Sequence, residues 1–351
     1  MTARRANGST DHDGSAGPAA AGADAARPGP GPAGTVPAGG ERRGAERRGA
    51  GHRGPLDRVP PAALVLTGVF SVQFGAGLAA QLFTEIPPAA VTALRLWTAA
   101  ILLGAAAARG LGRAVAGVVA RRAWRDAAVA LAFGLTLAVM NYSIYQSFAR
   151  IPLGIAVTVE FLGPLVLAVA TSRRLLDLLW VALAGAGVAL LARGGSPAAG
   201  AGHGATVTGL AFGLAAGAAW VAYILLSRAT GRRFPGSSGL AIAMIVAAVA
   251  ITPVGVVTGG RALLRPAVIL TGAGIGLLSS TIPYSLELET LRRIPARVFG
   301  IWMSLEPAVA ALAGLVLLGQ ALSVREWLAI GCVMAACAGA ARGGATQAPQ
   351  A

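Results

Sequence analysis

The chain has 351 residues, of which 55% are hydrophobic and 12% charged, with a formal net charge of +15. Its apolar residues form runs of about 20 residues, the length of a helix that crosses a bilayer, and a soluble domain of this size could not bury some ten such helices. The basic residues lie in an N-terminal segment and in short loops, without a basic helix interleaved with aromatic residues, which argues against nucleic-acid binding. The sequence therefore predicts an all-α membrane protein.

Residues 1–58 are rich in Ala, Gly, Pro and Arg and show no apolar periodicity, so we expect a disordered cytoplasmic tail. No short apolar core with a cleavage site is present, so we expect the tail to be retained. Its arginines either touch anionic lipid headgroups or serve topology alone.

Ten apolar runs follow, separated by short loops. The predicted spans are 62–83, 88–108, 126–148, 153–171, 176–193, 206–228, 238–258, 266–290, 296–318 and 324–341. With the N-terminus inside, fourteen arginines fall in inner segments, the C-terminal end included, and five in outer loops. The positive-inside rule then predicts a multi-pass protein of the cytoplasmic membrane with both termini cytoplasmic.

An internal repeat relates the two halves. The tripeptide Arg-Ile-Pro at 150–152 recurs at 293–295, and a proline follows each tripeptide, at Pro164 and Pro307. Five helices in each half is an odd number, so the second half enters the membrane upside down, as in many secondary transporters. The predicted divisions are a first repeat over 59–194, a second over 195–342 and a tail over 343–351.

Five ionisable residues lie inside predicted spans, where a charge costs about 2.5–3.5 kcal/mol on insertion scales. They are Arg95, Glu160, Glu287, Glu289 and Glu306. Each is either functional or a structural partner inside the bundle, satisfied by hydroxyl groups or by Arg95.

Three prolines inside spans accompany these charges. Proline lacks an N–H and frees the carbonyl four residues earlier. Pro164, Pro283 and Pro307 thus free the carbonyls of Glu160, Ser279 and Met303. Freed carbonyls beside a carboxylate would form an acceptor cluster for a proton or an ammonium group, whereas the alternative is helix bending for packing alone.

Further polar residues occur at helical spacing within the spans and predict a polar lumen. They are Gln73, Asn141, Tyr145, Ser280, Tyr284, Trp220 and Tyr223. For Trp220 and Tyr223, ordinary packing or a place in an interfacial aromatic belt is an alternative at least as strong as ligand contact. The glycines at 209, 213 and 217 are expected to allow close helix packing.

Metal and cofactor chemistry finds no support in the sequence. The three histidines, His12, His52 and His203, lie outside the predicted spans, and the two cysteines form no ligand pattern. We expect no cofactor and no metal, and an intramembrane enzyme is disfavoured because no embedded nucleophile and base is apparent.

Several segments in the right order resemble the drug/metabolite transporter superfamily with paired EamA domains, and within it the inner-membrane threonine and homoserine exporters. The segments are 91–96 (Val-Thr-Ala-Leu-Arg-Leu), 140–142 (Met-Asn-Tyr), 152–164, 283–287 (Pro-Tyr-Ser-Leu-Glu) and 303–307 (Met-Ser-Leu-Glu-Pro). The resemblance implies ten helices in two inverted halves, a central cavity and export of small amino acids driven by proton exchange. It also implies importance for Arg95, Asn141, Glu160, Glu287 and Glu306.

The expected mechanism is alternating access, in which one or more of the three glutamates change protonation as substrate leaves. Glu160 and Asn141 would accept the substrate ammonium, and Arg95 or Tyr284 would bind its carboxylate. The alternatives are export of other metabolites or drugs, a lipid-linked-sugar flippase and a passive channel. The expected partners are a small-molecule substrate, protons and the bilayer, and the choice between monomer and homodimer stays open.

Overall fold

The computed structural model describes residues 59–172, 177–192, 206–234 and 236–343. The chain divides into Met1–Gly54 and Pro55–Ala351, and every element below belongs to the second unit. The predicted tail over 1–58 and all but the first residue of the predicted tail over 343–351 lie outside the described residues. Within the described ranges the secondary structure is helical and contains no strand, in agreement with the predicted class.

Each of the ten predicted spans corresponds to a helix or to an interrupted helix. They are α2 (Pro61–Leu82), α3 (Pro88–Ala106), α5 (Trp124–Phe148), α6 and α7 (Leu153–Glu160, Leu162–Ala170), α8 (Asp177–Ala192), α9 (Val207–Gly231), α10 (Ser238–Gly259), α11 and α12 (Pro266–Gly276, Ile282–Leu291), α13 and α14 (Ala296–Met303, Glu306–Leu318) and α15 (Val324–Gly343). In the described ranges nine are long and apolar enough to cross a membrane, and α8 is a shorter apolar helix. The ten-helix membrane fold is confirmed.

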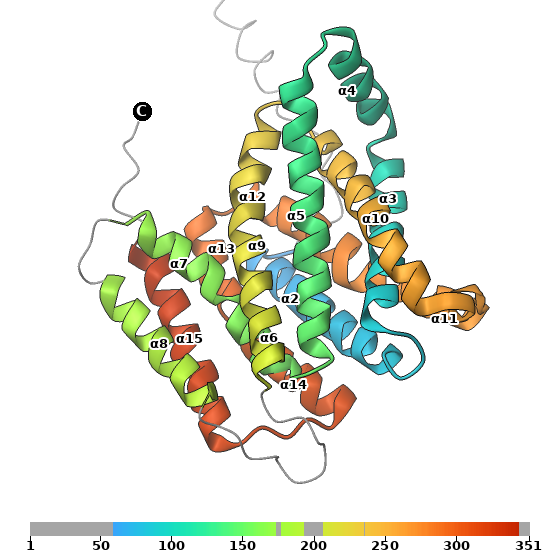
Figure 1. Cartoon of the computed structure of the whole chain (residues 1–351). Coiled ribbons are helices and arrows are strands. Elements are labelled where there is room, and N and C mark those ends of the chain that lie inside the picture. The colour runs from blue at the N-terminus through green and yellow to red at the C-terminus, as the bar shows by residue number, and fades with distance from the viewer. Residues whose placement is uncertain (1–58, 173–176, 193–205, 235, 344–351) are drawn as a thin grey trace, which may run out of the picture. The chain divides into compact units, whose positions relative to one another are not determined.

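One helix was not predicted. The connection expected between 109 and 125 contains α4 (Ala108–Ala120), which Figure 1 shows beside the end of α3. Its buried face is small: Ala114 packs with Val118 and, across the interface, with Ala130, Phe234 and Ile242. Thirteen residues are too few to span a bilayer, so α4 is an accessory helix at one membrane end.

The packing joins the two halves rather than separating them. Helix α2 of the first half packs on α12 and α14 of the second half. Helix α9 of the second half packs in turn on α5, α6 and α7 of the first half. Pairs at equivalent places in the two halves also meet, because α3 contacts α10 and α8 contacts α15 (Figure 1). Exchanging the two halves maps these contacts onto one another, which is the pattern of an inverted-repeat transporter.

The fourth and ninth spans are built alike. α6 and α13 each begin directly after a proline, Pro152 or Pro295, and each has 8 residues. Their C-caps, Phe161 and Ser304, have nearly the same helical φ and ψ, and the chain then continues into α7 and α14. The repeated Arg-Ile-Pro tripeptides therefore mark two helices that are interrupted at equivalent points.

Glycine allows the interruption after α6 to be covered by α9. A Cβ atom at Gly163 would overlap the carbonyl oxygen of Gly217, and a Cβ atom at Gly217 would lie 2.6 Å from the carbonyl oxygen of Glu160. Side chains larger than hydrogen cannot be accommodated where two backbones approach this closely.

Replacing Gly163 with Val should therefore separate α7 from α9 and destabilise the fold by about 1–3 kcal/mol or more, the range for overpacked cores. The measurement is the melting temperature and monodispersity of the purified full-length protein in detergent. Gly331→Val is the matched control, because it makes the same change within α15 at a position with no atom within 4 Å of the added Cβ. Equal melting temperatures for the two variants would contradict the packing argument.

Candidate functional site

Nearly all the predicted polar site residues meet on one cavity of about 630 Å³. The wall includes Gln73, Arg95, Asn141, Glu160, Trp220, Tyr223, Tyr284, Glu287 and Glu306, together with Pro164 and Pro283. These residues come from α2, α3, α5, α6, α7, α9, α12 and α14, so both halves contribute. Tyr145 and Pro307 do not belong to the wall.

The cavity extends from the middle of the bundle toward the membrane end at which α2 begins. Its wall there is formed by Ala168, Ser227, Leu291, Phe299 and Ala341, which lie near the ends of α7, α9, α12 and α15 and at the start of α13. Because consecutive spans alternate in direction, these helix ends all lie at that membrane end.

The opposite membrane end is closed by contacts between the halves. The Gln81 Nε2 donates to the Leu317 carbonyl at 2.7 Å, and the Leu153 backbone N–H donates to the Gln320 Oε1 at 2.9 Å. A Cβ atom at Gly154 would lie 2.7 Å from Ala311, so α6 and α14 also cross closely there. The cavity thus reaches one membrane end and is sealed from the other.

Glu306 lies at the interruption between α13 and α14 and is the first residue of α14. It is 7% exposed, and its Oε1 accepts a hydrogen bond from the Gln73 Nε2 at 2.8 Å. The positive end of the α14 dipole favours a carboxylate at this position. The Glu306 Oε2 and the Gln73 Oε1 are buried without a hydrogen-bond partner among the described residues, so the pair retains acceptor capacity toward the cavity.

Arg95 is held by the interrupted eighth span. A π-helical turn (Leu277–Thr281) separates α11 from α12, ahead of Pro283. The Arg95 Nη2 donates to the Ser279 carbonyl at 2.9 Å, and its Nε donates to the Ser280 Oγ at 3.0 Å. Arg95 therefore satisfies the carbonyl that Pro283 is expected to free.

Tyr145 supports Arg95 from behind the cavity wall. The Tyr145 side chain is fully buried, and the Arg95 guanidinium lies 5.3 Å from the centroid of its ring. This geometry is a cation–π contact, which stabilises a cation away from water. Within the described residues Arg95 forms no ion pair with a carboxylate, although three glutamates share its cavity.

Glu160 is the last residue of α6 and lies at the interruption of its own span. Its carbonyl oxygen lies against Gly217 on α9, whereas its side chain lines the cavity. Next to it, Phe161 and Trp220 form an edge-to-face pair with centroids 4.9 Å apart. Trp220 thus packs against Phe161 and also lines the cavity.

Glu287 and Tyr284 project from α12 toward the part of the wall that Tyr223 forms on α9. No described residue forms a hydrogen bond or an ion pair with Glu287. Tyr223 packs on Phe133, with ring centroids 5.4 Å apart. Asn141 is more constrained, since its Nδ2 donates to the Leu137 carbonyl at 2.8 Å.

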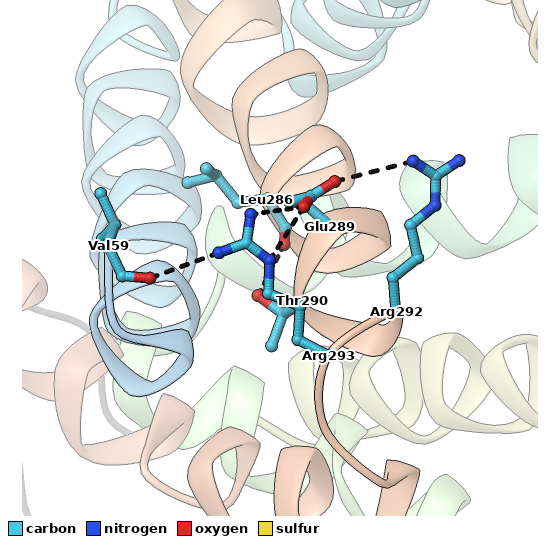
Figure 2. A network of polar contacts seen from close by, with 6 residues as sticks. All are labelled: Val59, Leu286, Glu289, Thr290, Arg292 and Arg293. Atoms are coloured by element: carbon cyan, nitrogen blue, oxygen red, sulfur yellow. Dashed lines mark hydrogen bonds and ion pairs between the residues drawn. The ribbon is translucent and has the colours of Figure 1, made fainter. Parts of the chain in front are cut away.

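Glu289 lies outside the cavity, near the end of α12. Figure 2 shows it between Arg292 and Arg293: its Oε2 lies 3.6 Å from the Arg292 Nη1, and its Oε1 accepts from the Arg293 Nε at 2.9 Å. The Arg293 Nη1 also donates to the Val59 carbonyl at 3.4 Å, which ties this helix end to the segment two residues before α2. Glu289 therefore pairs with neighbouring arginines at the helix end, and among the described residues neither hydroxyl groups nor Arg95 are its partners.

The sequence did not single out the apolar part of the wall. Val157, Phe299 and Met303 line the cavity beside the carboxylates, but apolar residues at cavity and packing positions look alike in a membrane span. Within the described residues no group of three His, Cys, Asp or Glu side chains could hold a metal ion. The three histidines lie outside those residues.

Comparisons with known proteins agree with this architecture. The model of the EamA-like transporter family matches residues 207–342. The threonine/homoserine exporter RhtA of Escherichia coli K12 is 37% identical over 285 residues, which cover 80% of this chain and 90% of that protein. RhtA of Salmonella typhimurium SL1344 is 36% identical over the same shares, and the transporter YwfM of Bacillus subtilis is 30% identical over 36% of this chain and 43% of its own.

A solved crystal structure resembles the fold with a TM-score of 0.54 at 19% identity, covering 79% of this chain and 95% of its own. At this identity the likeness shows the fold alone. The sequence identity to the RhtA exporters extends over most of both chains. The cavity lies between the two halves, which are arranged as an inverted repeat. This chain is a multi-pass membrane protein that belongs to the EamA-like transporter family.

Proposed function

We propose that this transporter exports small neutral amino acids of the threonine and homoserine class from the cytoplasm in exchange for protons. The RhtA relatives are named as exporters of these two compounds. The observation that carries the proposal is the composition of the cavity wall, which places one guanidinium and three carboxyl groups in one space without an ion pair between them.

The wall offers complementary groups for a zwitterion. Arg95 commits its Nε and Nη2 to the protein, which leaves its Nη1 for a substrate carboxylate. Glu306, with an Oε2 that lacks a described partner, and Glu160 offer acceptors for the ammonium group. The hydroxyl groups of Tyr284 and Tyr223 can bind the substrate side chain.

Charge balance couples this site to protons. Three ionised carboxylates and one arginine would leave two uncompensated negative charges in a cavity within the helix bundle, which is unfavourable. Either a proton or the substrate ammonium can neutralise a carboxylate, and occupation by one disfavours the other. Competition of this kind for one group yields antiport. One proton moving through 100 mV provides about 2.3 kcal/mol, enough for a roughly fortyfold gradient of a neutral substrate.

Alternating access follows from the paired interruptions. In the described conformation the cavity reaches the end at which α2 begins, and contacts of α2 and α6 with the α14 region close the other end. The arginine distribution assigns the open end to the cytoplasm. Because α6 and α13 are equivalent, rocking of the halves would close this end and open the other.

Replacing Glu306 with Gln should abolish proton-driven export. The Gln side chain has nearly the shape of Glu, but its amide cannot take up and release a proton. The measurement is uptake of radiolabelled threonine and homoserine into inverted membrane vesicles, with and without an imposed proton gradient. Glu85→Gln, the same change at an exposed position outside the cavity wall, should transport as the unaltered protein does. Gradient-driven uptake retained by Glu306→Gln would argue against this coupling, and uptake of neither compound by the unaltered protein would refute the substrate class.

Replacing Arg95 with Gln should remove recognition of the substrate carboxylate. The uptake assay measures how strongly unlabelled threonine and threoninol inhibit uptake of the radiolabelled substrate. Threoninol lacks the carboxylate, so the two inhibition constants are compared. The unaltered protein should prefer threonine by roughly tenfold or more, the value of one charge-assisted hydrogen bond. The variant should treat both alike. Because Arg95 also binds the π-helical turn before α12, loss of activity alone is uninformative. An unchanged ratio of the two inhibition constants would contradict the assignment.

The native Cys337 tests the direction of the opening, because it lines the cavity and Cys332 does not. In a Cys332→Ser background a membrane-impermeant maleimide should label Cys337 in inverted vesicles and spare it in right-side-out vesicles. Threonine should slow the labelling. A Cys337→Ser variant retaining Cys332 gives the background rate. Faster labelling in right-side-out vesicles would reverse the assigned orientation.

A further inference from the structure

A second cavity, of about 680 Å³, lies between α4, the start of α5 and the connection from α9 to α10. It shares no wall residue with the central cavity. It lies at the membrane end where α3 and α9 end, the end toward which the central cavity extends. The transport proposal does not use it.

The wall of this second cavity carries an excess of positive charge. Arg109, Arg113, Arg121 and Arg233 line it, and Asp126 is its one carboxylate. Asp126 already pairs with Arg233, at 3.2 Å between its Oδ1 and the Arg233 Nε. Within the described residues, no carboxylate lies within ion-pair distance of the other three arginines.

Backbone contacts hold two of these arginines in place. The Arg113 Nε donates to the Arg109 carbonyl at 3.1 Å, and the Arg121 Nε donates to the Gly117 carbonyl at 3.2 Å. The terminal nitrogens of both guanidinium groups have no described hydrogen-bond partner. Guanidinium groups that line one cavity repel one another unless an anion binds, and their planar donors match a phosphate well.

α4 is an addition to the inverted repeat. The equivalent connection in the second half, between α10 and α11, contains the short 3-10 turn Gly260–Leu264 in place of a helix of 13 residues. The transport architecture therefore does not require α4. Its arginines contribute to the positive-inside distribution, which does not by itself require them to line a cavity.

The surroundings of the cavity point to the bilayer surface. Val115 and Val119 on α4 are 48% and 65% exposed, and Trp124 directly beyond it is 67% exposed. Apolar residues exposed on a basic helix, with a tryptophan beside them, are typical of a helix at the level of the lipid headgroups. One turn before the α3 residues of the cavity wall, the apolar side chains of Ile101 and Leu102 are 62% and 38% exposed.

We propose that this cavity binds the headgroup phosphate of an anionic phospholipid, whose acyl chains lie along the exposed face of α3. A soluble organic phosphate offers the same anion without the chains. The continuity of the arginine wall with the apolar residues Ile101 and Leu102 favours the lipid. The assignment is independent of the substrate of the central cavity.

The test compares the unaltered full-length protein with Arg109→Gln/Arg113→Gln, two exposed positions whose change should leave the fold intact. Native mass spectrometry in detergent measures bound phosphatidylglycerol across a titration. The double variant should bind it roughly thirtyfold more weakly, the combined effect of two arginines near an anionic headgroup. Phosphatidylcholine should bind to neither protein.

Arg125→Gln/Arg342→Gln is the control, because it removes the same net charge from exposed positions at the same membrane end, outside the cavity wall. It should retain phosphatidylglycerol. Equal affinity in all three proteins, or equal loss in both double variants, would overturn a specific site. Glycerol 3-phosphate provides the soluble arm: binding as tight as that of the lipid, and lost in the first variant, would overturn the lipid as the ligand.

Discussion

Backbone groups that lose their helical partner inside a bilayer must find another within the protein, and this constraint organises the transporter. Three spans are interrupted near their middle, and neighbouring helices cover two of the carbonyls expected to be freed. The Ser279 carbonyl accepts from Arg95, and the Glu160 carbonyl lies against the bare backbone of Gly217. An interruption that is covered in this way can place a charged side chain at mid-membrane depth without exposing the backbone to lipid.

The interruptions also explain why the charges converge. Glu160 ends α6 and Glu306 begins α14, so each carboxylate lies where its span changes from one helical segment to the next. The two halves pack on each other through equivalent helices, which brings these points to a common cavity. The Gln73 side chain binds Glu306, and the Tyr145 ring stabilises Arg95 from behind. Glu306 and Arg95 are thus each supported by a neutral partner.

The two halves differ where the repeat is not required. α4 and its arginine-lined cavity occupy one connection, whereas the equivalent connection in the other half is a single short turn. The two membrane surfaces differ in lipid composition and in charge. An accessory helix can contact one surface without altering the symmetric transport core. Glu289 and Arg293 have a local role of another kind. Glu289 pairs with Arg293, and Arg293 binds Val59, two residues before α2 (Figure 2).

The sequence by itself determined the membrane class, the ten spans, the repeat and the identity of the embedded polar residues. These properties follow from the length of the apolar runs and from the positions of charged residues within them, both of which can be read from the sequence. It also anticipated that Pro283 would release the Ser279 carbonyl, because the rule is local.

Only the tertiary structure decided which of those residues share a wall. It placed Glu287 on the cavity and Glu289 at the end of α12, although they lie two positions apart, because the side chains point to different sides of one helix. It showed that Tyr145 lies behind Arg95 and does not line the cavity. It also showed that α4 and Arg233, which is distant in the sequence, line one basic cavity. Contacts between helices far apart in sequence depend on packing geometry, which no local pattern of residues contains.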